Sequence, residues 1–307
     1  MAVDSRRPAG GPAPVQLLIV PYDSGHRGVR MGKGPEHLAG HGAAARLRAA
    51  SHTVAEHPIE IDQAFPAEIA SAFALQRAVA EHVGAAVATG WFPLLLAGNC
   101  NNAVGVAAGL AAAADERAPV GVVWLDAHGD FNTPETTTSG FLDGMALATL
   151  TGRCWRALAV SVPRFRPVPE DHVLLLGGRD LDEQERNALE GSPMLWVPDA
   201  HIREHGPAQA LGPALDLLAS RVELVYLHID LDIHDPEYAP ANPYAAPGGL
   251  DPSTVRQVVR LVAERLPLAA GTLAAYDPGC DTEDRMLTAA LDLVELLAEL
   301  APGTTPT

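Results

Sequence analysis

Short apolar runs alternate with longer amphipathic segments along most of the chain. The apolar runs are nearly continuous in Val, Leu and Ile, which is typical of strands covered on both faces of a sheet. They predict strands at 15–21, 53–57, 93–97, 120–126, 172–177, 194–197, 224–230 and 272–276. The segments between them predict helices over 35–50, 67–89, 102–114, 183–190, 208–220, 252–264 and 283–301. This alternation predicts an α/β fold with a parallel sheet between helices, and a ligand site at the carboxyl ends of the strands.

Composition narrows the class of protein. Of the 307 residues 48% are apolar, and 21 Lys and Arg face 38 Asp and Glu, for a net charge of −17. The apolar share excludes a disordered chain, and the acidic balance argues against nucleic-acid binding. The apolar runs are far shorter than the roughly 20 residues of a membrane span. We therefore expect a small-molecule ligand and neither a nucleic-acid nor a membrane partner.

No linker or fixed-period repeat divides the chain, so we expect a single domain over 15–301 with disordered tails at 1–14 and 302–307. Cys100, Cys154 and Cys280 are odd in number and form no CxxC pair. A disulfide framework is not expected, and a reducing cytoplasm fits.

Two predicted strands end in residues of the types that bind metals. Strand 120–126 leads directly into Asp126, His128 and Asp130, and strand 224–230 into Asp230 and Asp232. Alternate side chains of an extended segment share a face, so each set can point at one small volume. Four converging carboxylates repel one another without a cation, and mixed Asp/His ligation suits Mn, Zn or Fe. A single such set would be read as solvated loop acids or helix caps, but two sets at the ends of buried strands favour a metal centre.

The same segments resemble a known family. The run at 126–140, DAHGDFNTPETTTSG, is similar to the DAHxDxNTPxTTTSG signature of the arginase/agmatinase/formiminoglutamase (ureohydrolase) family. DLDIHDP at 230–236 resembles its DxDxxDP motif, GGRDLD at 177–182 its GxRDxD strand end, and MGKGP at 31–35 its N-terminal GxGP loop. The resemblance extends from about 15 to 301. It implies a three-layer α-β-α sandwich with a mainly parallel, eight-stranded sheet.

The resemblance also implies a chemistry: two Mn²⁺ ions bridge a hydroxide that attacks a guanidinium carbon. Asp126 would bridge the metals, His128 and Asp232 would complete one of them with Asp230 shared, and Asp130 would bind the other. Three further positions match family contacts to the carboxylate or α-amino group of an amino-acid substrate: Asn132, Ser139 and Asp182. A homo-oligomer, trimeric or hexameric, is implied as well.

One departure from the family affects the metal ligands. Where the family has GGDHS, with a metal-binding His, this chain has GNCNN at 98–102, and we read Asn101 as standing in for that His. An amide oxygen is a weaker donor to Mn²⁺ than imidazole, so we expect one or two metals per chain, with Zn²⁺ or Fe²⁺ as alternatives to Mn²⁺. The neighbouring Cys100 is either a small buried hydrophobe or a soft ligand or nucleophile.

Two departures affect catalysis. In SGFLDG at 139–144, Asp143 takes the place of the family's proton-shuttling His, and Phe141 replaces an Asn that contacts the substrate carboxylate. Asp143 is either a general acid with a raised pKa or a solvent-facing loop residue. Together with His128, it is our candidate for a catalytic residue.

Ala275 replaces the Glu of the late ExxP motif, which binds the guanidinium. An unpaired buried guanidinium loses on the order of 2–5 kcal/mol, so L-arginine is not the expected substrate.

Two functions remain open at this point. The first is a metal-dependent hydrolase of a C–N bond in a guanidino, amidino or amide compound. The alternative is a metal-depleted relative that acts as a binding or regulatory subunit, which the three departures favour. Retention of all five Asp and His ligands favours the enzyme.

Overall fold

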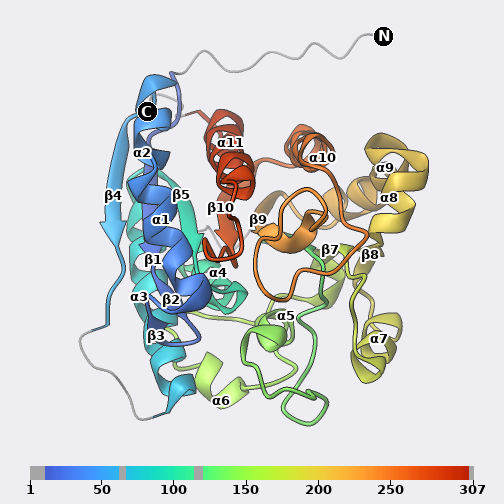
Figure 1. Cartoon of the computed structure of the whole chain (residues 1–307). Coiled ribbons are helices and arrows are strands. Elements are labelled where there is room, and N and C mark those ends of the chain that lie inside the picture. The colour runs from blue at the N-terminus through green and yellow to red at the C-terminus, as the bar shows by residue number, and fades with distance from the viewer. Residues whose placement is uncertain (1–10, 62–66, 114–119, 304–307) are drawn as a thin grey trace.

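The computed structural model describes residues 11–61, 67–113 and 120–303. Its centre is a single eight-stranded sheet in the order β4-β1-β5-β10-β9-β6-β7-β8, in which each neighbouring pair is parallel (Figure 1). The strands are β1 Val15–Val20, β4 Val54–Pro58, β5 Phe92–Ala97, β6 Val120–Asp126, β7 Val173–Gly177, β8 Leu195–Val197, β9 Leu224–Asp230 and β10 Leu268–Ala274. A two-stranded hairpin of β2 Tyr22–Asp23 and β3 His26–Arg27 lies beside it.

Helices cover both faces of the sheet. Alternate strand residues, such as Leu17 and Leu18 of β1, belong to two separate hydrophobic clusters. The cluster with Leu17 includes residues of α1 Gly34–Gly40, α2 Ala43–Ala49, α8 Asp199–His205, α9 Pro207–Ala219, α10 Pro252–Arg265 and α11 Arg285–Leu300. The cluster with Leu18 includes residues of α3 Glu68–Ala88, α4 Ala103–Ala113, α5 Ala146–Leu150, α6 Arg156–Ala159 and α7 Glu183–Glu190. The predicted three-layer α-β-α sandwich is confirmed.

Two predicted elements differ from the structure by more than two residues at an end. The helix predicted over 35–50 is two helices, because Gly42 has a left-handed φ of 98° that interrupts the helical path between α1 and α2. The strand predicted at 272–276 is β10, which begins at Leu268 and ends before Ala275, a residue with a φ of 62°. Gly271 lies where a β-carbon would come within 3.2 Å of both Leu94 and Leu297, so a small residue suits this crowded central strand. The short helices α5, α6 and α8 were not predicted.

At the amino-terminal end, two residues placed in the predicted tail contact the fold. Ala13 is buried, and the carbonyl of Pro14 accepts a hydrogen bond from the Phe92 amide at 2.8 Å. Of the predicted tails, residues 1–10 and 304–307 lie outside the described residues. Within the described part of the chain, no helix has the length and apolar character needed to cross a membrane.

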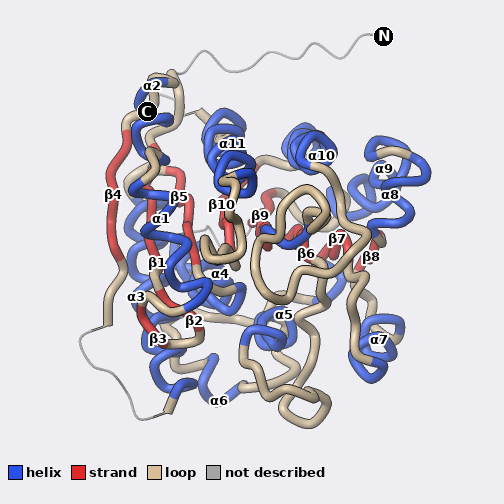
Figure 2. The backbone as a smooth tube through the Cα atoms, viewed as in Figure 1, coloured by secondary structure: helices blue, strands red, loops and turns tan. Residues whose placement is uncertain are grey.

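The irregular segments after β6 and β9, tan in Figure 2, lie near the middle of the sheet. Since the eight strands of the main sheet are parallel, their carboxyl ends lie on the same side of it, which is where open α/β sheets bind ligands. This arrangement brings the chemistry-bearing loops together.

Candidate functional site

A cavity of about 640 Å³ opens at the carboxyl ends of the central strands. The acids at its floor come from the two sequence motifs: Asp130 after β6, and Asp230 and Asp232 at the end of β9. His128 and Asp143 also line it. The predicted convergence of the two motifs on one volume is therefore present in the structure.

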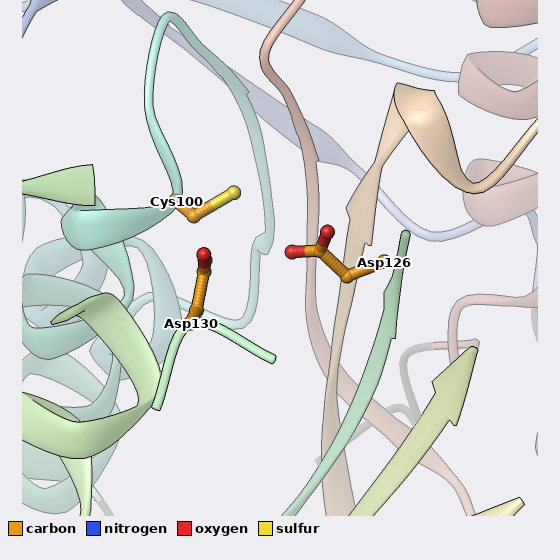
Figure 3. A group of neighbouring side chains, drawn as sticks. All are labelled: Cys100, Asp126 and Asp130. Carbon is orange, nitrogen blue, oxygen red and sulfur yellow. The ribbon is translucent and has the colours of Figure 1, made fainter. Parts of the chain in front are cut away.

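Three side chains form the first ligand-type group: Cys100, Asp126 and Asp130. Each offers a sulfur or oxygen atom within 4.8 Å of the other two, and all three residues are buried. Figure 3 shows them pointing toward a common space, Cys100 from the turn after β5 and the two acids from the end of β6 and the loop that follows. Asp130 has a left-handed φ of 49°, which Asp tolerates better than most residues.

The second group shares Asp126 with the first and adds His128 and Asp232, again with ligand atoms within 4.8 Å of one another. His128 Nδ1 lies 3.3 Å from Asp126 Oδ1 and 3.3 Å from Asp232 Oδ2. Asp230 joins the two groups, because its Oδ2 accepts a hydrogen bond from Cys100 Sγ at 3.0 Å and its Oδ1 one from the Asp232 amide at 2.8 Å.

An outer layer of donors fixes these carboxylates. Trp124 Nε1 donates to Asp126 Oδ2 at 3.0 Å, and the indole stacks on His228 at 3.8 Å. Asn242 Nδ2 donates to Asp232 Oδ2 at 3.2 Å. Arg179, from the GxRDxD motif, donates to the backbone carbonyl of Asp232 at 2.6 Å and so holds the turn after β9. Such outer partners orient ligands and tune a bound metal.

The electrostatics of the floor call for a cation. Burial, together with neighbouring carboxylates, raises the pKa of Asp126, Asp130 and Asp230. Burial works in the same direction at Asp232, but the adjacent His128 outweighs it and lowers the pKa of that carboxyl. Asp130 Oδ2 is buried without a hydrogen-bond partner among the described residues. A divalent cation removes this repulsion and provides the missing partner, so the donor set fits a metal.

Asp143 is buried in the cavity wall, so the reading as a solvent-facing loop residue is wrong. Its Oδ2 accepts a hydrogen bond from Asn99 Nδ2 at 2.8 Å, and its Oδ1 accepts one from the backbone N–H of Asn101 at 3.0 Å. Burial raises the pKa of Asp143 to about 7, although both hydrogen bonds oppose the shift.

The predicted substrate-contacting residues line the same cavity: Asn132, Ser139, Phe141 and Asp182. Asn132 Nδ2 donates to Asp182 Oδ2 at 3.1 Å. The Phe141 ring lies 5.3 Å from Tyr244, and the Arg30 guanidinium is 5.8 Å from its centroid. Ala275 lines the cavity too, and its carbonyl accepts from Asn242 Nδ2 at 2.9 Å.

One sequence-based assignment is corrected. Asn101, predicted to replace the metal-binding His, lines a separate small cavity, where its Oδ1 accepts from Gln76 Nε2 at 3.3 Å. Cys100 is the residue that faces the carboxylates. The turn Cys100–Asn102 is a 3₁₀ helix, in which adjacent side chains diverge by about a third of a turn.

Sequence reasoning also missed Trp124, Asn242 and Glu185. Glu185 lines the cavity, its Oε1 accepts from the Phe131 amide at 2.8 Å, and burial raises its pKa to about 7. The sequence offered only position as a signal for these contacts. Trp124 lies near the carboxyl end of strand β6, and Asn242 lies beside a motif loop.

Comparisons with known proteins agree with this geometry. The model of the "Arginase family" matches residues 13–299. An arginase of Brucella melitensis is 31% identical over 296 residues, which cover 92% of this chain and 94% of that protein. A crystal structure of Bacillus subtilis arginase superimposes with a TM-score of 0.84 at 28% identity, over 93% of this chain and 98% of that one. A formimidoylglutamase of B. subtilis, at 18% identity and a TM-score of 0.73, shares the fold. The chain belongs to the arginase family of metal-dependent amidinohydrolases.

Proposed function

We propose that this protein hydrolyses a C–N bond in a small guanidino, amidino or amide compound other than L-arginine. The observation that carries the proposal is the pair of ligand-type groups sharing Asp126 at the floor of a substrate-sized cavity. The acids Asp126, Asp130, Asp230 and Asp232, with His128, would hold the metal, as one or two Mn²⁺, Zn²⁺ or Fe²⁺ ions per chain. A bound divalent ion would supply Lewis acidity and make water a competent nucleophile near neutral pH.

The chain's own residues supply the proton. Hydrolysis joins a water oxygen to the substrate carbon and breaks the C–N bond, so the departing nitrogen must gain a proton. Asp143 lines the cavity and has a pKa raised to about 7 by burial, so part of its population carries a proton at neutral pH. We assign Asp143 as the general acid.

The cavity walls favour a cationic compound. Apart from the groups proposed to hold metal, and from Asp143 and Glu185 with their raised pKa values, the lining has three acids and one base: Glu68, Asp180 and Asp182 against Arg30. Clefts lined with one sign of charge concentrate ligands of the opposite sign. The aromatic pair Phe141 and Tyr244 in the lining suits an apolar portion of the same molecule.

The test is a screen of metal-loaded protein against guanidino, amidino and amide compounds, with release of urea, ammonia or amine as the readout. Elemental analysis of the same samples gives the metal content. His128→Ala should lose both metal and hydrolysis, whereas His57→Ala, on the edge strand β4, should lose neither. Bound metal without hydrolysis of any compound would reject the proposal and support a binding or regulatory subunit. A trimeric or hexameric assembly and a cytoplasmic location stay predictions, which light scattering and cell fractionation can check.

A further inference from the structure

Cys100 is surrounded in a way that a structural cysteine is not. It is 1% exposed, and its Sγ lies 3.0 Å from Asp230 Oδ2 and within 4.8 Å of ligand oxygens of Asp126 and Asp130 (Figure 3). A buried cysteine that only fills space packs against apolar groups. Cys154 provides the contrast: it is buried in the hydrophobic cluster with Leu18, its Sγ contacts the Thr149 hydroxyl at 3.4 Å, and it belongs to neither ligand-type group.

A second observation points into the same space. Asp130 Oδ2 is buried and has no hydrogen-bond partner among residues 11–61, 67–113 and 120–303. Unpaired buried carboxylate oxygens are costly, so this atom calls for a cation or a donor. The sulfur of Cys100 and an oxygen of Asp126 are the other ligand atoms that face the same point.

We propose that Cys100 ligates the metal as a thiolate, together with Asp126 and Asp130, and that this position therefore selects Zn²⁺ over Mn²⁺. On metal binding the thiol proton leaves to solvent, the S–H···O contact to Asp230 breaks and a sulfur–metal bond forms. Thiolate is a soft ligand that favours Zn²⁺, whereas an all-oxygen set suits Mn²⁺. The inference rests on the proposed function only in that both need metal at this centre.

The Asn101 side chain strengthens the assignment. It is turned toward Gln76, on α3, and so leaves Cys100 as the ligand-type side chain that the turn after β5 presents to the carboxylates. The backbone N–H of Asn101 donates a hydrogen bond to Asp143 Oδ1 at 3.0 Å, which ties the turn to the cavity wall.

The direct test uses the unmodified chain. Apoprotein is loaded with Zn²⁺ and examined by X-ray absorption at the zinc edge. The expected result is a sulfur scatterer at about 2.3 Å beside oxygen or nitrogen scatterers at about 2.0–2.2 Å. Loading with Co²⁺ should give a sulfur-to-cobalt charge-transfer band in the near ultraviolet. An oxygen- and nitrogen-only zinc shell, or failure to bind zinc, would overturn the inference.

Variants locate the sulfur. Cys100→Ser should abolish the band and weaken Zn²⁺ binding by more than the roughly 10–100-fold typical of losing an outer-shell partner, while Cys154→Ser and Cys280→Ser should keep it. Cys100→His should also abolish the band while retaining metal, with a lower preference for Zn²⁺ over Mn²⁺ in competition. It serves as the second variant if Cys100→Ser does not fold. A band that survives both Cys100 substitutions overturns the assignment.

These readouts separate the two proposals. A sulfur-containing zinc site in a protein without hydrolase activity leaves this inference standing and rejects the proposed function. Hydrolysis by a protein whose bound metal lacks sulfur does the reverse.

Discussion

At the scale of single residues, Asp143 shows how neighbours set chemistry. The Asn99 side chain and the backbone N–H of Asn101 each donate a hydrogen bond to one of its carboxylate oxygens, and burial raises its pKa to about 7. Asp143→Asn should therefore lower turnover by roughly 10²–10⁴-fold with metal content unchanged. A proton donor must be protonated to act, so the wild-type rate should fall as pH rises through about 7, and the variant should lack that limb.

The control for this prediction is Glu237→Gln, an exposed acid that does not line the cavity. It should change turnover little. Unchanged turnover in Asp143→Asn with metal retained would show that Asp143 only supports the loop.

The second prediction at this scale concerns Ala275 and the hydrolysis of L-arginine. The Ala275 methyl group lines the cavity at the position where the resemblance places a guanidinium-binding Glu, and a buried guanidinium would have no carboxylate there. Urea release from L-arginine by fully metal-loaded protein should stay below about 1 s⁻¹, tenfold under a typical turnover number. Steady-state urea assays check this, and a rate of about 10 s⁻¹ would contradict it.

The residues also show where sequence reasoning reaches its limit. Asp126, His128 and Asp130 follow a strand, whose period of two fixes their side-chain directions, and the motif residues Asp230 and Asp232 follow another. Cys100 and Asn101 lie in a turn without such a period. Which of the two faces the acids depends on contacts with Gln76 and Asp230, which are distant in sequence.

At the scale of elements, the apolar pattern predicted the inner strands of the main sheet because burial on both faces produces continuous runs. The edge strand β4, VAEHP, is only partly buried and gave a weaker pattern. The apolar pattern merged α1 and α2, since apolar residues keep their helical spacing across Gly42 although the backbone does not. It missed the start of β10 because Ala269, Ala270 and Gly271 are poor strand formers. At Gly271 the small residue fits the close neighbours Leu94 and Leu297.

Helix α10 gives a prediction about stability. Asp251 caps its amino-terminus by accepting from the Ser253 and Thr254 amides at 2.9 and 3.1 Å. Asp251→Ala should lower the free energy of unfolding by about 1 kcal/mol. Asp216→Ala, which removes an exposed ion pair with Arg265, should cost less. Urea unfolding at pH 7 measures both, and equal effects would contradict the capping role.

The pH dependence of this cap has a definite sign. Burial raises the pKa of Asp251, but hydrogen bonds from Ser253 and Thr254 outweigh it and lower the pKa from 3.8 to about 2. The folded state therefore favours the carboxylate, so the cap stabilises above pH 3.8 and loses this contribution as pH falls toward 2. The difference between wild type and Asp251→Ala should shrink in the same range.

At the scale of the whole molecule, the metal centre ties distant parts of the sheet together. Its ligand-type residues follow β5, β6 and β9, so cation binding favours the folded state over the unfolded one. Metal at about 100 times its Kd adds about 2.7 kcal/mol, and at roughly 2–4 °C per kcal/mol for large domains a chelator should lower the Tm by about 5–10 °C. Calorimetry with and without chelator measures this; His128→Ala should show a smaller shift, and an unchanged wild-type Tm would contradict it.

The position of β10 has a consequence for synthesis on the ribosome. The strand order places β10 between β5 and β9, although its residues, Leu268–Ala274, come last of the eight strands. Until they emerge, the nascent chain holds two part-sheets, β4-β1-β5 and β9-β6-β7-β8, whose facing edges carry unpaired backbone groups that invite aggregation. Cys100 follows β5 and lies in one half, whereas Asp126 and Asp230 lie in the other, so the ligand-type group that contains Cys100 is complete only after the same late insertion. The open edges of both part-sheets therefore persist until the carboxyl-terminal part of the chain is made, and β10 closes both at once.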